Sequence, residues 1–299
     1  MATQHGDRLT RRQIILGAAG LALGLSGCHM RSTDKESNQQ SKVTLDKCPA
    51  LKSYIESMCS VPRGKCLMGS TEYDDEKPAH PVEVPAFKIG KTPVTVAMWE
   101  EFVHSANLRM PPEPDPGFEG AKNFNVGWKD KLHPIVNVSW TDCLQYLNWA
   151  NNVSGVGFSI PNEAMWEYAC RGGIDSQRFQ WGNEFDRSKL WCSNETLGDR
   201  GSTASVVRED FIWKDHPWGI LDMVGNVAEW CCTGNSMFPV SDSISDRKMG
   251  TKITDEPRFI RGGSWYFYLE DSFRCSTRSA VHPDSCSYDV GFRFCTLKV

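Results

Sequence analysis

The spacing of apolar side chains predicts a small number of helices in the first half of the chain. Between residues 96 and 106, large apolar side chains recur at intervals of three and four, the repeat of a helix with one buried face. They are Met98, Trp99, Phe102, Val103 and Ala106. A shorter amphipathic helix followed by a turn is predicted between Cys48 and Cys66.

A second long helix is predicted to begin after residues 134–139, which have the composition of a short buried strand. Ser139 is followed three residues later by Asp142, so the two side chains can satisfy the free backbone amides at a helix start. The side chains expected to face inward on this helix are Cys143, Tyr146, Leu147 and Ala150.

A third helix is predicted to begin near Asn162 and to end at Gly172 and Gly173, because glycine readily takes the left-handed conformation that closes a helix. Residues 110–119 contain four prolines and should form an extended loop. Beyond residue 175 the pattern indicates short strands and Gly-rich turns without an internal repeat. Helices first and irregular β structure afterwards predict an α+β fold.

The composition describes a globular protein with many loops. The 299 residues are 40% hydrophobic and 23% charged, enough to bury the core of one large domain or two small ones. Eleven Trp and 14 Phe accompany 25 Gly and 16 Pro, which favours loops held by buried aromatic rings over a helical bundle. The net charge of −4 and pI of about 6.0 give no basic surface for a nucleic-acid partner.

Residues 1–28 have the pattern of a signal peptide. Arg11 and Arg12 precede an apolar run that is too short to span a bilayer, and the run ends in Ser26-Gly27-Cys28. This ending resembles a lipobox, which predicts cleavage before Cys28 and attachment of lipid to its sulfur. An uncleaved amphipathic tail is the alternative, and the arginine pair fits a twin-arginine signal as well as an ordinary secretory one.

Residues 29–47 are polar and predict a flexible tether, so the folded domain is expected to cover residues 48–299. The expected location is the periplasmic side of the cell envelope, with the membrane as a partner through the lipid on Cys28. His29, rather than Asp, follows the lipidated cysteine, which by analogy favours the outer membrane.

Eleven cysteines remain once Cys28 is set aside, an odd number that leaves at least one thiol unpaired in an oxidising compartment. No C-x-x-C pair and no H-x-x-x-H spacing occurs, so no zinc or iron ligand set can be recognised locally. Structural disulfides with buried thiols are the favoured interpretation, and a redox or metal role for some of them is the alternative.

Four sequence strings together resemble the formylglycine-generating-enzyme (sulfatase-modifying-factor) family. They are residues 161–173 (PNEAMWEYACRGG), 219–230 (GILDMVGNVAEW), 261–265 (RGGSW) and 291–293 (GFR). The earlier strings MGS (68–70), HPV (80–82) and HPIVNVSW (133–140) extend the resemblance from about residue 58 to the C-terminus. It implies an α+β fold related to C-type lectins, with little regular secondary structure.

The resemblance also implies structural calcium. The first family site maps onto the Asp222 and Glu229 carboxylates and the Gly225 and Val227 carbonyls, which are hard oxygen ligands that suit Ca²⁺. A second site maps less directly, and its ligands are Asn194, the Glu195 carbonyl, Asp199 and the Gly201 carbonyl. The alternative is that these carboxylates cap turns and accept backbone hydrogen bonds without a metal. No redox metal can be assigned from the sequence.

The reactive cysteine pair of the family's formylglycine-forming enzymes is missing. In those enzymes the pair lies a few residues after the RGGS turn and binds copper. In this chain residues 265–272 read WYFYLEDS and contain no cysteine. Cys275 matches a different family cysteine and is expected to be structural. Formylglycine synthesis by the usual route is therefore not expected.

Two other branches of the family bear on the function. The ergothioneine-type iron enzymes need an added His-bearing domain for which this chain has no room. Exported oxidases of siderophore maturation, such as those that finish pyoverdine, also lack the cysteine pair, and the chain is most similar to them. The resemblance places a candidate cleft for a small-molecule or peptide substrate at Ser264, Trp265, Tyr266, Arg274 and Arg278.

Two alternatives to an oxidase cleft remain open. The same five residues could be core aromatics and arginines that bind backbone carbonyls. The protein could also be a non-catalytic lipoprotein whose lectin-like surface binds an envelope-protein or glycan partner.

Overall fold

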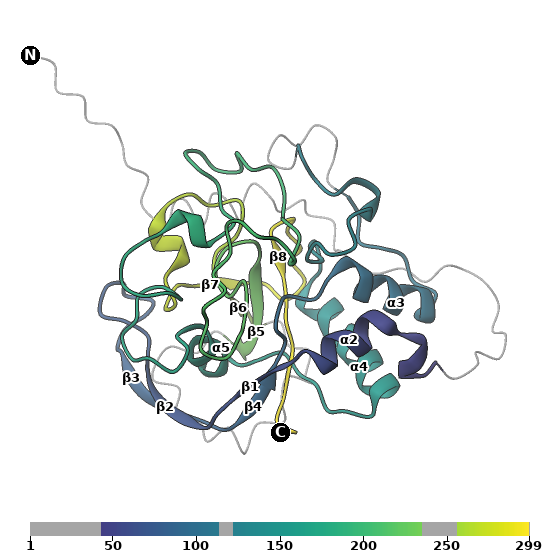
Figure 1. Ribbon diagram of the computed structural model, residues 1–299, viewed down its shortest axis with the longest axis horizontal. Helices are drawn as coiled ribbons and strands as arrows, with labels where there is room; N and C mark the ends of the chain where they lie inside the picture. The colour runs from purple at the N-terminus through teal and green to yellow at the C-terminus, as the bar shows by residue number, and fades with distance from the viewer. Residues whose placement is uncertain (1–42, 114–121, 235–255, 299) are drawn as a thin grey trace, which may run out of the picture.

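In the computed structural model, three helices pack together on one side of the molecule. The structure describes residues 43–113, 122–234 and 256–298. The helices are α2 (Pro49–Glu56), α3 (Val96–Ala106) and α4 (Trp140–Ser154), and Figure 1 shows them side by side. Trp99 of α3 stacks on Tyr146 of α4 with ring centroids 5.3 Å apart. An aromatic core therefore joins helices that are separated in the sequence.

The predicted ends of the second and third helices are confirmed, whereas the segment predicted as a helix and turn between Cys48 and Cys66 is helical only over Pro49–Glu56 and continues as strands. The Ser139 hydroxyl accepts a hydrogen bond from the Asp142 amide at 3.0 Å, and the Asp142 carboxylate accepts one in return from the Ser139 amide, also at 3.0 Å. Helix α5 (Glu163–Cys170) begins after Asn162, whose side chain accepts a hydrogen bond from the Met165 amide. It is closed by Gly172, which has a φ of 61°.

The strand predicted at residues 134–139 is wrong. The segment is buried, but it forms only an isolated bridge between Pro134 and Thr95. Asn137 has a φ of 60°, which interrupts the extended backbone. The Ile135 amide donates to Val94, whereas the Asn137 amide donates to Ser287. Because these backbone amides donate to two different segments, the continuous hydrogen bonding of a strand cannot form.

The β structure consists of three small sheets. The largest has the order β7-β6-β5-β8, with β5 and β8 parallel and the other pairs antiparallel. A second sheet has the order β1-β4-β9, and β2 pairs with β3 in a hairpin. The strands are β1 (Cys59–Val61), β2 (Gly64–Met68), β3 (His80–Val84), β4 (Phe87–Ile89), β5 (Ala228–Gly234), β6 (Arg258–Arg261), β7 (Arg278–Val281), β8 (Val290–Gly291) and β9 (Cys295–Thr296).

Short 3₁₀ segments connect these elements: η1 (Leu45–Lys47), η3 (Val126–Trp128), η4 (Arg187–Lys189) and η5 (Glu270–Phe273). Helix α5 lies beside the largest sheet (Figure 1), on the other side of the molecule from α2, α3 and α4. The fold is thus α+β, with few helices and several small sheets, as predicted.

Buried ion pairs hold the long loops against α5 and the sheets. Arg261 of β6 donates to Glu167 of α5 at 2.6 Å, and Arg171 binds the same carboxylate at 2.7 Å. All three side chains are buried. Arg171 also donates to the backbone carbonyls of Gly69 and Gln177, which lie in the loops after β2 and α5. Because a buried charge is costly unless it is paired, these contacts fix the positions of the loops as well as neutralising one another.

The folded region begins before the expected boundary at residue 48. Leu45–Lys47 form η1, and Val43 and Leu45 pack against the helical core, although the sequence placed them in the tether. Cys28, the rest of the predicted signal peptide and residues 29–42 lie outside the described residues, as does most of the predicted loop at 110–119. Among the described residues, no helix has the length and apolar character needed to cross a bilayer.

Candidate functional site

The turn after β6 brings Ser264 to the half-buried carboxyl group of Asp289. Gly262 and Gly263 form this turn with φ values of 94° and 65°. A Cβ on Gly262 would lie 2.5 Å from the Met223 carbonyl oxygen, so only glycine fits there. The Ser264 hydroxyl then donates to Asp289 Oδ2 at 2.6 Å, immediately before β8.

The pKa of the Asp289 carboxyl group is raised. Burial raises its pKa, although the hydroxyls of Ser264 and Ser287 donate to it and act in the opposite direction. The pKa of Tyr266 is also raised, first by burial and then by the negative charge of Asp289. A carboxyl group and a phenol are therefore electrostatically coupled beside Ser264, a combination that can accept and return protons.

Aromatic rings surround this polar group. The Trp265 ring is buried and its indole nitrogen donates to the Tyr288 carbonyl at 3.1 Å, while the Tyr266 ring meets Trp265 edge-on at 5.6 Å. Tyr266 and Tyr288 are half-buried. The predicted residues Ser264, Trp265 and Tyr266 therefore do come together, with Asp289 as an additional member. We refer to Ser264, Tyr266 and Asp289 as the Ser-Tyr-Asp cluster.

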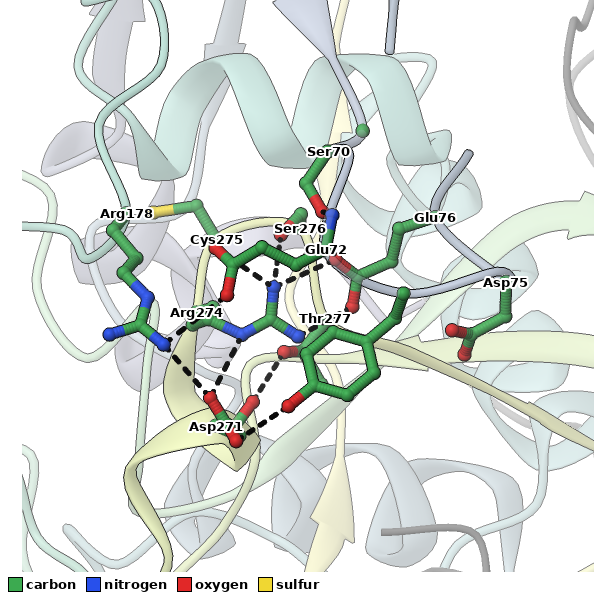
Figure 2. A network of polar contacts seen from close by, with 12 residues as sticks. Ser70, Glu72, Asp75, Glu76, Arg178, Asp271, Arg274, Cys275, Ser276 and Thr277 are labelled. Carbon is green, nitrogen blue, oxygen red and sulfur yellow. Dashed lines mark hydrogen bonds and ion pairs between the residues drawn. The ribbon is translucent and has the colours of Figure 1, made fainter. Parts of the chain in front are cut away.

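Arg274 does not belong to this cluster. Its guanidinium is completely buried and binds Glu76 through two hydrogen bonds of 2.8 Å each. Figure 2 shows it at the centre of a network, with Asp271 3.5 Å from its Nε and the Ser276 hydroxyl 3.2 Å from Nη1. The Tyr73 ring lies over it at 4.4 Å. An arginine that is buried and paired with Glu76 in this way is not available to hold an anionic substrate.

Arg278 is likewise part of the interior. Its guanidinium stacks on the Phe259 ring at 3.4 Å and pairs with the Glu163 carboxylate of α5. Both predicted arginines are therefore core residues, as in the alternative interpretation of the sequence, but they pair mainly with carboxylates and not with backbone carbonyls. The candidate site keeps its serine and aromatics but not the arginines for a substrate anion.

The described cysteines are mostly buried, and residues 265–272 after the RGGS turn contain no thiol. Eight of the eleven described cysteines are buried, and three are half-buried: Cys59, Cys232 and Cys286. Burial raises the pKa of Cys66 and of Cys295 to about 12, which keeps these thiols protonated and unreactive. Cys275 lies with its sulfur 3.2 Å from that of Cys170, far inside the protein, as expected of a structural cysteine.

At the first predicted calcium site the carboxylates already have cationic partners. Arg208 donates to both oxygens of Asp222 at 2.7 Å, and Arg293 donates to both oxygens of Glu229 at 2.7–2.9 Å. Gly225 and Val227 lie on the same turn, as predicted. The two carboxylates are thus close to one another, but their oxygens are used by guanidinium groups and do not fit a calcium ion.

At the second predicted site the residues cap a turn. The Asp199 carboxylate accepts hydrogen bonds from the amides of Asn194 and Glu195 at 2.8–2.9 Å. Burial acts to raise its pKa, but these donors outweigh burial and the pKa is lowered. Arg200 donates to the Asn194 side chain, and the Gly201 carbonyl accepts from a backbone amide. Over the described part of the chain, no group of three or more His, Cys, Asp or Glu side chains is arranged to hold a metal.

Sequence reasoning missed Asp289, Arg208 and the role of Arg293. Arg293 belongs to the GFR string, so its position could have been noted. Asp289 and Arg208 are single charged residues in loops, 25 and 14 residues from their partners Ser264 and Asp222. No local pattern marks such contacts.

Residues 46–297 match the family described as the sulfatase-modifying factor enzyme 1-like domain. The chain belongs to this family. It is 31% identical over 210 residues to the formylglycine-generating enzyme of Streptomyces coelicolor, covering 66% of this chain and 60% of that enzyme. The chain therefore spans only three fifths of the length of that relative.

A further relative is named as inactive, and a solved structure shares the fold. The chain is 29% identical over 293 residues to the mouse (Mus musculus) protein named inactive C-alpha-formylglycine-generating enzyme 2, covering 82% of this chain and 88% of that protein. The solved structure of PvdO from Pseudomonas aeruginosa superimposes with a TM-score of 0.62 at 22% identity, over 80% of this chain and 93% of PvdO. The likeness to PvdO shows a shared fold.

Proposed function

We propose that this protein is an exported lipoprotein that acts as an oxidase-type maturation factor and not as a thiol-dependent formylglycine synthase. The observation that carries the proposal is the Ser-Tyr-Asp cluster, which stands beside the RGGS turn and contains no sulfur. We propose a reduced aromatic chromophore as the substrate, and the resemblance to siderophore-maturation oxidases supports this class. The lipobox pattern ending at Cys28 supports export and attachment to the outer membrane.

The reaction proposed is a two-electron oxidation with O₂ as the electron acceptor. The dihydro-chromophore loses two electrons and two protons, and O₂ takes up both pairs to become H₂O₂. The ionised Asp289 carboxylate accepts one substrate proton and returns it to the reduced oxygen. Its raised pKa makes it a stronger base than an exposed aspartate, and Ser264 and Ser287 hold it in place. The half-buried ring of Tyr266 offers a face on which a flat substrate can stack.

The test is oxygen consumption by the purified protein with the dihydro form of a pyoverdine chromophore. Wild type is expected to consume one O₂ and release one H₂O₂ per chromophore oxidised. Asp289→Asn removes the base without changing the side-chain size and should lower kcat by about 10²-fold or more. Asp74→Asn is the matched control, because the Asp74 side chain is fully exposed.

Cys286→Ser separates this chemistry from thiol chemistry. Cys286 is half-buried and lies in the same loop as Asp289. The proposal predicts full turnover for this variant. Loss of turnover in Cys286→Ser, or unchanged turnover in Asp289→Asn, would show that the Ser-Tyr-Asp cluster does not carry the reaction.

A binding role is the second candidate, favoured by two exposed apolar side chains on adjacent segments. Leu132 and Val207 are 50% and 70% exposed, and the Val206 amide donates to the Leu132 carbonyl, so the two segments are adjacent. A non-catalytic scaffold would show no oxygen uptake with any chromophore, and would crosslink to one fixed envelope protein. Replacing Leu132 and Val207 by Ser should then abolish that crosslink while the melting temperature stays unchanged.

A further inference from the structure

The turn at residues 219–230 carries two buried carboxylates that are both neutralised by arginine. Glu229 is completely buried, and its two oxygens accept four hydrogen bonds, three from Arg293 and one from the Trp166 indole. A carboxylate offers about four lone pairs, so Glu229 has none left for a metal.

Asp222 is held in the same way by a different segment. Arg208 contacts each carboxylate oxygen at 2.7 Å, a two-pronged geometry that is especially favourable for guanidinium. The Asn226 side-chain amide donates to Oδ2 at 3.0 Å. Three of the four acceptor positions of Asp222 are therefore taken, and the Arg208 side chain covers the face of the carboxylate that it binds.

The charges of the four side chains also argue against a calcium ion at this turn. Asp222 and Glu229 contribute two negative charges, and Arg208 and Arg293 contribute two positive charges, so the group is neutral as it stands. Adding Ca²⁺ would leave two uncompensated positive charges in a buried environment, which is strongly unfavourable. A calcium ion also needs six to eight oxygen ligands, which this saturated group cannot offer.

We propose that Arg208 and Arg293 stabilise this turn in place of a calcium ion, and that the stability of the turn is therefore independent of calcium. The two arginines connect four segments, which are residues 205–211, the turn itself, the segment of Arg293 and the segment of Gly90. Arg208 also donates to the carbonyls of Ser205 and Phe211, which closes the loop between them, and Arg293 donates to the carbonyls of Gly90 and Leu221.

The turn held by these arginines also contacts the candidate site. Asn226, which binds Asp222, accepts the Trp265 amide at 3.0 Å through its own carbonyl. Trp265 follows Ser264 directly, so the position of the Ser-Tyr-Asp cluster depends on the same turn. Arg208 is accordingly a positioning residue, which acts through Asp222 and Asn226 without contact with the Ser-Tyr-Asp cluster.

The test compares melting temperatures in excess chelator and in millimolar Ca²⁺. Every protein in it, including the one called wild type, carries Asp199→Asn, so that the second predicted calcium site does not contribute. The wild-type protein is expected to melt at the same temperature in both. Arg208→Ala leaves the Asp222 charge buried without its partner, and its melting temperature in chelator should fall by roughly 10 °C. With Arg208 removed, the vacated face of Asp222 is open to a cation, and Ca²⁺ should restore part of this loss.

Arg208→Lys provides a second variant if Arg208→Ala does not fold, because it keeps the positive charge but loses the two-pronged contact. It should fold, melt below wild type and remain insensitive to Ca²⁺. A rise in the wild-type melting temperature with Ca²⁺, or stoichiometric binding of Ca²⁺ to wild type in a calorimetric titration, would overturn the proposal. A calcium response of Arg208→Lys that equals that of Arg208→Ala would also overturn it. None of these readouts depends on oxidase activity.

Discussion

Cys170 and Cys275 are expected to form a disulfide when the protein folds in an oxidising compartment. Their sulfur atoms are 3.2 Å apart, so a bond of about 2.05 Å needs only a small movement of the two side chains. Both residues are buried, and they join the end of α5 to the segment after η5. Replacing both by Ser removes the crosslink with little change in volume.

The magnitude follows from the length of chain that the bond closes. The two cysteines are 105 positions apart, and closing a loop of about 100 residues removes roughly 4.7 kcal/mol of unfolded-state entropy. The double variant should therefore melt roughly 10–15 °C below the oxidised wild type. Peptide mapping of the oxidised protein without reduction should yield one crosslinked pair that contains both residues.

The two single variants test whether Cys170 and Cys275 form the same disulfide. Cys170→Ser and Cys275→Ser each break the same bond, so each should cost about as much as the double variant. Adding reductant should lower the wild-type melting temperature but not that of the double variant. Additive losses from the two single variants, or a crosslink of Cys275 to a different cysteine, would refute the reasoning.

Three further predictions concern charge and anchoring. Because Asp289 has a raised pKa when folded, the unfolded chain releases its proton first, and this carboxyl destabilises the protein increasingly as pH rises from about 4 through the folded pKa. Asp289→Asn should therefore melt above wild type at pH 7, and a lower melting temperature there would contradict this. Burial lowers the pKa of His216 to about 4, so stability should fall as pH decreases from about 6.5 to 4, and a His216→Gln variant that folds should show a flatter pH profile over that range. Cys28→Ala should move the protein from the membrane to the soluble periplasmic fraction, and membrane retention of this variant would contradict lipidation at Cys28.

Local chemistry made part of the fold predictable from the sequence. Ser139 with Asp142, Asn162, and the Gly172-Gly173 pair each act within a few residues, and all three mark helix ends correctly. Residues 134–139 show the limit of this reasoning. Their apolar composition predicts burial, which is correct, but Asn137 bonds to Ser287 and breaks the strand. No local signal specifies that partner.

The candidate site was predictable only where it is contiguous. Ser264, Trp265 and Tyr266 follow a Gly-Gly turn and must lie close together, whereas Asp289 reaches Ser264 from a separate segment. Arg274 and Arg278 follow the same turn, yet Glu76 and Glu163 draw them into the interior. The sequence does not reveal which arginines will meet a buried carboxylate, because that choice depends on tertiary packing. Calcium binding at Asn194 and Asp199 stays a prediction.

The most direct test of the account is whether this protein can form formylglycine without the usual cysteine pair. Purified protein is incubated with copper, O₂ and a sulfatase-derived peptide that contains the substrate cysteine, and the peptide is analysed by mass spectrometry after labelling of aldehydes. We predict that the peptide keeps its cysteine, because residues 265–272 carry no thiol. An aldehyde-bearing peptide in amounts that exceed the protein would contradict the account.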